Sequence, residues 1–109
     1  TDAARRAATV AAAQAVVQQG GVLTATGARS ILFAYLPDLG KTPDRIGGPL
    51  SQTLTELTQL FNQTLGAGIA QLRLANPTAN YFDLRLDNLF ANVLGSPGSF
   101  GFTNTTQAC

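Results

Sequence analysis

Residues 30–36 read Ser-Ile-Leu-Phe-Ala-Tyr-Leu, an uninterrupted apolar run that Pro37 follows. A strand with one side in water alternates apolar and polar residues, whereas a continuous run is typical of a strand covered on both faces, as in a parallel sheet. Proline cannot donate a ladder hydrogen bond, so we expect the strand to stop before Pro37. This stretch therefore predicts an α/β fold.

Helical patterns lie on both sides of this run. Residues 3–26 are rich in alanine, the best helix former, and Gly27 is placed as a C-terminal cap. Residues 54–74 hold an apolar stripe at helical spacing, and Thr53 and Glu56 have the spacing of a capping box at its start. We therefore expect one helix before the strand and a second, long helix after it.

A second strand and a third helix complete the pattern. Residues 79–84 are expected to form the strand, and residues 86–94 the helix, with Gly95 just past its end. A crossover connection would make the two strands parallel neighbours. Two parallel strands do not form a stable open sheet alone. Residues 1–109 are therefore expected to be a single incomplete α/β domain, cut from the middle of a larger fold.

The composition excludes several kinds of chemistry. No histidine occurs in the 109 residues, and the one cysteine is Cys109. A Ser-His-Asp or Cys-His relay needs an imidazole, and zinc or non-haem iron sites normally use His or Cys ligands. We therefore expect no catalytic residue, no metal site and no cofactor in this chain. It is either non-catalytic or a piece of a larger enzyme, and the second alternative is favoured.

Charged residues make up only 12% of the chain, about half the usual share, and the net charge is +1. The basic residues are scattered, so the electrostatic footprint of a nucleic-acid binder is absent. No apolar run approaches the length of a membrane-spanning helix. A polar but weakly charged surface is common on exported proteins.

Three groups of residues, taken in order, carry a resemblance to a known family. They are residues 27–32 leading into 36–40; Phe61-Asn62; and Asp83-Leu84, Leu89-Phe90 and Val93-Leu94 followed by Gly101-Phe102-Thr103-Asn104. This series resembles the later middle part of the GDSL-type lipolytic enzymes, or SGNH hydrolases, especially secreted and autotransporter esterases of bacteria. The resemblance covers roughly residues 27–109.

The resemblance implies the central piece of a flavodoxin-like α/β/α fold in the order helix-strand-helix-strand-helix. It also implies a carboxylic ester hydrolase that acts through a seryl acyl-enzyme, secreted by a bacterium or associated with its outer membrane. The family's Ser motif, its oxyanion Gly and Asn, and its Asp-x-x-His pair have no counterpart here, so they are expected on the remainder of the hydrolase, as a second chain or missing segments. Ala34-Tyr35 departs from the family, whose members often have Pro-Asn there, so the substrate range does not carry over.

Candidate pocket residues follow from the expected sheet. Open parallel sheets bind ligands beyond the carboxyl ends of their strands. Residues 37–40 follow the first strand, so Pro37, Asp38 and Leu39 are candidates to line a pocket for an ester or lipid substrate. The alternative is that Asp38 caps a turn while its neighbours pack, and for Asp38 this alternative is favoured over a chemical role.

Other residues leave alternatives open. Asp38 and Asp83 at adjacent strand ends would permit acid/base work on glycosides, but nearly any chain with two such aspartates offers that pairing. Ser51 is better explained as a helix cap than as a nucleophile. Cys109 either forms a disulfide with a partner outside this sequence, as the resemblance implies, or remains a free thiol.

A different class of function remains the rival. A non-enzymatic, mainly helical binding or scaffold domain needs no histidine and would fold as a lone monomer. A companion polypeptide that carries Ser and His would favour the hydrolase instead.

Overall fold

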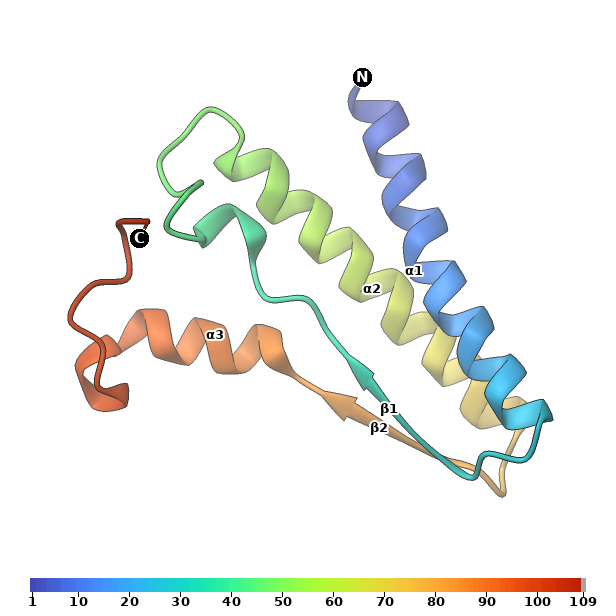
Figure 1. The fold of residues 1–109 in the computed structure, drawn as a ribbon. Helices are drawn as coiled ribbons and strands as arrows, with labels where there is room; N and C mark the ends of the chain where they lie inside the picture. The colour runs from blue at the N-terminus through green and yellow to red at the C-terminus, as the bar shows by residue number, and fades with distance from the viewer. Residues whose placement is uncertain (109) are drawn as a thin grey trace.

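The computed structural model describes residues 1–108, and Cys109 lies outside the described residues. Figure 1 shows its elements in the expected order of helix, strand, helix, strand, helix. The described elements are α1 (Asp2–Ala25), β1 (Ser30–Ala34), the short 3-10 helix η1 (Leu39–Lys41), α2 (Ser51–Ala75), β2 (Asn80–Leu84), α3 (Leu86–Gly95) and the 3-10 helix η2 (Pro97–Phe100). The predicted α/β class, with two strands between helices, is confirmed.

The two strands pair in parallel, in register from Ser30 opposite Asn80 to Ala34 opposite Leu84. Helices α1 and α2 run side by side over one face of this pair, while α3 continues away from the end of β2 (Figure 1). The parallel pairing that the sequence predicts is therefore confirmed.

The core lies between the sheet and the two long helices. Ile31 and Phe33 of β1 and Tyr81 of β2 point toward the helices and are buried. Leu65 and Ile69, on one face of α2 four residues apart, are fully buried against them. Period-two burial on the strand thus meets the helical period of α2 and forms one contiguous core.

Helix α1 ends and packs as its sequence indicates. Gly27 adopts a positive φ of 113°, and its N–H donates to the carbonyl of Thr24, so the predicted cap is confirmed. About two turns earlier, Gly20 lets the Phe33 ring approach so closely that a Cβ there would lie 3.0 Å from Cε1. The buried Thr24 hydroxyl also forms a 2.7 Å hydrogen bond with the Tyr81 hydroxyl. These contacts join α1 to both strands.

The predicted start of α2 is wrong. The helix begins at Ser51 with Leu50 as its N-cap residue, and no side chain caps it, so Thr53 and Glu56 do not form a capping box. Ser51 is not a cap either, because its hydroxyl donates a 2.7 Å hydrogen bond to the carbonyl of Gly40. The first turn of α2 lies against η1, where the Thr55 hydroxyl bonds to Asp38, while the Glu56 carboxylate accepts a hydrogen bond from Gln52 in place of the cap.

Smaller differences concern the ends of β1 and α3. Strand β1 ends at Ala34, two residues before the predicted end, although the N–H of Tyr35 still donates to the carbonyl of Leu84. Gly95 is the last residue of α3 rather than the first residue after it.

Among the described residues, no helix combines the length and apolarity that crossing a bilayer requires.

The second face of the sheet differs from the prediction that both faces are covered. Leu32 and its register partner Phe82 are 60% and 53% exposed, and Leu84 is 41% exposed. The reason is that α1 and α2 both lie on the other face. Within residues 1–108 the strand pair is therefore covered on one side only.

Candidate functional site at the carboxyl ends of the strands

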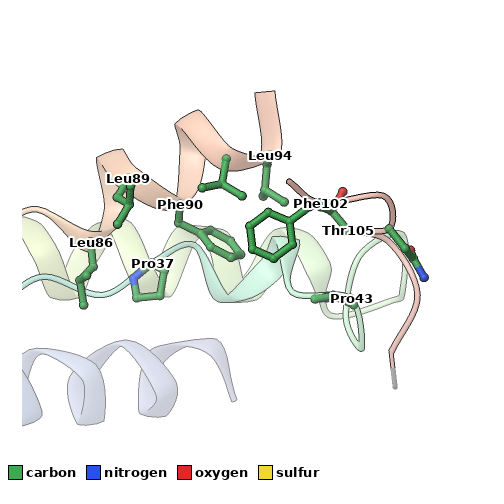
Figure 2. A pocket seen from close by; sticks show the side chains of 10 residues that line it. Pro37, Pro43, Leu86, Leu89, Phe90, Leu94, Phe102 and Thr105 are labelled. Carbon is green, nitrogen blue, oxygen red and sulfur yellow. The ribbon is translucent and has the colours of Figure 1, made fainter. Parts of the chain in front are cut away.

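An apolar trough of about 350 Å³ lies beyond the carboxyl ends of β1 and β2, between α3 and the loop that follows β1 (Figure 2). Its volume falls within the range of about 300–1,000 Å³ that small-molecule sites occupy. None of the residues that line it carries a charge. They are Pro37, Pro43, Leu86, Leu89, Phe90, Val93, Leu94, Phe102, Asn104 and Thr105.

Helix α3 forms one wall because its apolar residues recur every three or four positions, from Leu86 to Leu94, and so share one face. Pro37 and Pro43 stand on the opposite wall, where their fixed φ angles restrict the loop. Beyond α3, Gly101 adopts a positive φ of 83° and reverses the chain. This turn brings Phe102 back toward α3, where Figure 2 shows its ring beside Phe90.

The three candidate pocket residues have different surroundings. Pro37 lines the trough. The Asp38 carboxylate accepts a 3.0 Å hydrogen bond from the N–H of Gly40 and a 2.7 Å bond from the Thr55 hydroxyl, so it caps η1 as the structural alternative requires. The N–H of Leu39 donates a 3.3 Å bond to the hydroxyl of Thr58. Asp38 and Leu39 thus attach the loop to α2, and their part in substrate binding stays a prediction.

A second cavity of about 390 Å³ adjoins the trough and shares Phe90, Leu94 and Thr105 with it. Asp38 and Lys41 are on its wall, so it is more polar than the trough. Within residues 1–108, Lys41 forms no ion pair. An apolar space and a space with polar walls therefore meet beyond the strand ends.

Sequence reasoning missed the wall that α3 provides. The sequence predicted a helix over residues 86–94 but gave it no part in the pocket, whereas α3 has no buried residue, and its Leu89 is 52% exposed beside the trough. The available signal was the position of the stripe directly after a strand of a parallel sheet, where binding residues gather.

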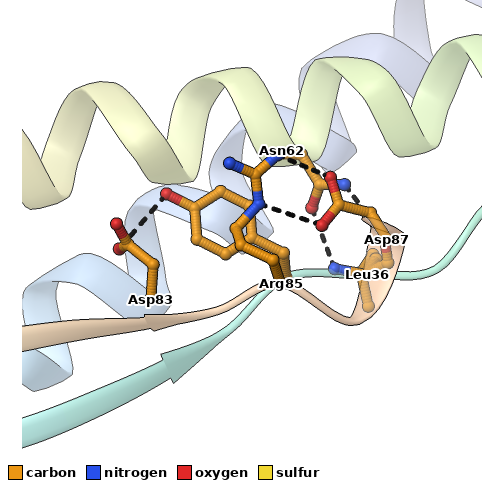
Figure 3. A network of polar contacts seen from close by, with 6 residues as sticks. Leu36, Asn62, Asp83, Arg85 and Asp87 are labelled. Carbon is orange, nitrogen blue, oxygen red and sulfur yellow. Dashed lines mark hydrogen bonds and ion pairs between the residues drawn. The ribbon is translucent and has the colours of Figure 1, made fainter. Parts of the chain in front are cut away.

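A polar cluster fixes the end of the strand pair on the side of α2 (Figure 3). Arg85 lies over the Tyr35 ring, 4.5 Å from its centroid, and makes two hydrogen bonds of 2.8 and 3.0 Å to Asp87. The Tyr35 hydroxyl reaches Asp83, which also pairs with Arg73 at 3.2 Å. Because each arginine has an acidic partner, the cluster leaves no free charge for a ligand, and we assign it a structural role.

The same cluster separates the two aspartates of the suggested acid/base pair. The oxygens of Asp83 meet Tyr35 and Arg73, whereas Asp38 meets Gly40 and Thr55. The two carboxylates share no contact, and nothing in this arrangement supports joint acid/base work. Asp87 lies in the first turn of α3, where a negative charge is favourable, and the hydrogen bond from Arg85 lowers the pKa of its carboxyl.

Tyr35 gives a pH prediction. Burial, and then the negative charge of Asp83, raise the pKa of its hydroxyl above 10.0. Because the folded-state pKa exceeds the unfolded one, Tyr35 stabilises the fold fully below pH 10.0, and this contribution is lost as pH rises through the higher folded value. In Tyr35→Phe, we expect the part of the phenolate absorbance that appears at the highest pH to be lost. The free energy of unfolding should also fall less steeply as the pH rises above 10.0. An unchanged decline in the variant would show that Tyr35 is not its source.

Asn62 of α2 holds the chain just before the trough. Its side-chain carbonyl accepts a hydrogen bond from the N–H of Leu36, and its amide donates to the carbonyl of Leu36, both at 2.9 Å (Figure 3). The side chain thus pairs with the backbone as a neighbouring strand would. Leu36 directly precedes Pro37, so Asn62 positions the entry to the trough wall.

Comparison with known proteins gives partial matches along most of the chain. No protein-family model matches the sequence. It is 37% identical over 100 residues to an uncharacterized protein from the trpE-trpG intergenic region of Pseudomonas putida, over 92% of this chain and 15% of that protein. It is 38% identical over 74 residues to esterase EstA of Pseudomonas aeruginosa, over 68% of this chain and 11% of the esterase.

A plant protein matches more weakly. A GDSL esterase/lipase of Arabidopsis thaliana is 25% identical over 89 residues, which is 76% of this chain and 24% of that protein. The chain therefore spans less than a quarter of the length of these relatives. The partial matches support a relationship to GDSL-type lipolytic enzymes.

Proposed function

We propose that this chain is the central portion of a GDSL-type carboxylic ester hydrolase with a flavodoxin-like α/β/α fold. The observation that carries the proposal is its 38% identity to esterase EstA over 74 residues. The name of the plant relative, a GDSL esterase/lipase, points to the same chemistry. The reaction would be acyl transfer to water through a seryl acyl-enzyme.

The surface of the strand pair supports the view that more polypeptide belongs to this domain. Leu32, Phe82 and Leu84 form an exposed apolar face, and no third strand among the described residues pairs with the outer edge of β1 or β2. Parallel sheets occur almost only with several strands and with helices on both faces. We infer that further strands and helices of the same hydrolase cover this face.

The composition indicates which parts of the active site this chain would supply and which it would not. The chain holds no histidine, so the serine, its histidine and the oxyanion donors would lie on the remainder of the hydrolase. Residues 1–108 would contribute two strands, the helices on one face and the trough at the carboxyl ends of the strands, where open parallel sheets bind their ligands. The substrate would be an ester or a lipid. The protein would be secreted or associated with the outer membrane.

In the proposed reaction, the serine oxygen bonds to the carbonyl carbon of the ester while the histidine takes the hydroxyl proton. The tetrahedral intermediate collapses, and the alcohol leaves with the proton from the histidine. Water then attacks the acyl-serine with the same histidine as base, and the carboxylic acid is released. Nothing in residues 1–108 would exchange a proton in these steps, because the chain's part is to position the substrate.

The test uses the full protein that carries this chain, with p-nitrophenyl butyrate as substrate and a fluorophosphonate probe for an activated serine. We expect hydrolysis of the ester and labelling of one serine outside residues 1–109. Intact mass with and without reductant would show whether Cys109 joins the chain to another polypeptide. Absence of both hydrolysis and labelling, or a label within residues 1–109, would overturn the proposal.

A further inference from the structure

We infer that the trough between α3 and residues 37–43 binds the alkyl part of an acyl group, and that Leu89 supplies apolar surface that a longer chain contacts and a short one does not. The inference rests on the proposed function for the identity of the reaction. The shape and lining of the trough carry the alkyl specificity independently.

The lining favours an alkyl ligand over a polar one. Eight of the ten lining residues are proline, leucine, valine or phenylalanine, and the other two are Asn104 and Thr105. A hydroxylated or charged ligand would lose its hydrogen bonds to water and find almost no replacement there. An alkyl chain has no such bonds to lose and removes apolar side chains such as Leu89 from water.

The same lining argues against a strand or loop whose backbone is buried in the trough. Every residue of a strand or loop other than proline brings one backbone N–H and one C=O that need partners when buried. The trough wall offers polar side chains only at Asn104 and Thr105, near the point where the tail crosses α3. A peptide could satisfy its backbone only as a helix, for which a trough of about 350 Å³ is small.

The neighbouring cavity gives the bound chain a direction. It shares Phe90 and Leu94 with the trough, and Asp38 and Lys41 lie on its wall. An amphiphile therefore has an apolar space for its chain and a space with polar walls for its other end. Phe90 lines both spaces, so it stands where the apolar space meets the space with polar walls.

Leu89 permits a sharp test because it has a matched control on α2. Leu89 is 52% exposed on α3 and lines the trough, whereas Leu74 is 79% exposed near the end of α2 and does not line it. Both are helical leucines outside the core, so replacing either with asparagine leaves no core cavity. Leu89→Asn and Leu74→Asn should both leave the fold intact, which circular dichroism can verify.

The experiment measures decanoate binding to the full protein by titration calorimetry, and hydrolysis of p-nitrophenyl butyrate and decanoate. In Leu89→Asn we expect the dissociation constant for decanoate to rise about tenfold, because an amide in the trough must lose its water when the chain binds. The ratio of kcat/KM for the decanoate ester to that for the butyrate ester should fall about tenfold. Leu74→Asn should change neither quantity by more than about twofold.

The outcomes separate this inference from the proposed function. Hydrolysis of both esters with an unchanged ratio in Leu89→Asn would overturn the inference and leave the hydrolase standing. Decanoate binding that depends on Leu89, without hydrolysis of any ester, would support the alkyl site and overturn the hydrolase. Failure of decanoate to bind the wild-type protein would show that something else fills the trough, and would overturn the inference.

Discussion

Replacement of Gly40 with alanine should lower the free energy of unfolding by about 3 kcal/mol or more, because the new methyl group would overlap backbone atoms. A Cβ on Gly40 would lie 2.9 Å from the backbone nitrogen of Thr55, and it would collide with the carbonyl oxygen of Ser51 and the Thr55 hydroxyl. Two of these three atoms belong to the backbone of α2, so no rotamer change relieves the overlap. The strain should force η1 away from α2 and break the hydrogen bond from the Ser51 hydroxyl to Gly40.

Gly21→Ala is the matched control for this substitution. A Cβ on Gly21 would meet Leu72 at an ordinary 3.6 Å, and the residue lies inside α1. Alanine is a better helix former than glycine by about 1 kcal/mol, so Gly21→Ala should raise the free energy of unfolding. Urea unfolding of the two variants measures both effects. If Gly40→Ala costs less than about 1 kcal/mol, the contact between η1 and the first turn of α2 is not as close as described.

The strands and helices could be predicted because each depends mainly on residues that are neighbours in the sequence. The apolar run that contains Ile31 and Phe33, the alanine-rich helix and the cap at Gly27 are each decided by neighbouring residues. Their types and approximate bounds were therefore predictable. Parallel pairing followed because a helix lies between the strands.

The start of α2 was not predictable from local rules. Thr53 and Glu56 have a capping-box spacing, yet the structure places η1 against that turn, and the Thr55 hydroxyl bonds to Asp38 seventeen positions earlier in the chain. A contact between residues so far apart in sequence is invisible to a pattern that spans four residues. Tertiary contact therefore overrode the local signal.

The candidate site was also predictable only in part. Its place beyond the strand ends, and Pro37 on its wall, followed from the rule for parallel sheets. The role of Leu89 did not, because an apolar stripe on a helix looks identical whether it faces a core or an open trough. Only the exposure of that stripe in three dimensions distinguishes the two.

Asn62→Leu should lower the free energy of unfolding by about 2–6 kcal/mol, since it leaves both the N–H and the C=O of Leu36 without their partners, at about 1–3 kcal/mol for each group. Leucine branches at the same carbon as asparagine and is the larger residue, so the substitution leaves no cavity and its cost includes the loss of both hydrogen bonds. Asn62 also fixes the path of the chain. Its two hydrogen bonds form only when the backbone of Leu36 lies extended beside α2. The side chain therefore selects one path for the chain between β1 and the trough.

Amide hydrogen exchange locates this effect as well as measuring it. In the wild-type protein the N–H of Leu36 donates to Asn62 and that of Tyr35 donates to the carbonyl of Leu84. In Asn62→Leu, exchange at Leu36 should accelerate more than at Tyr35, because only Leu36 loses its acceptor. The control is Asn92→Leu, an exposed site on α3, which should change stability by less than about 0.5 kcal/mol. Equal acceleration at Leu36 and Tyr35 would mean that the whole sheet opens, and that Asn62 does not act locally on the residue that leads into the trough wall.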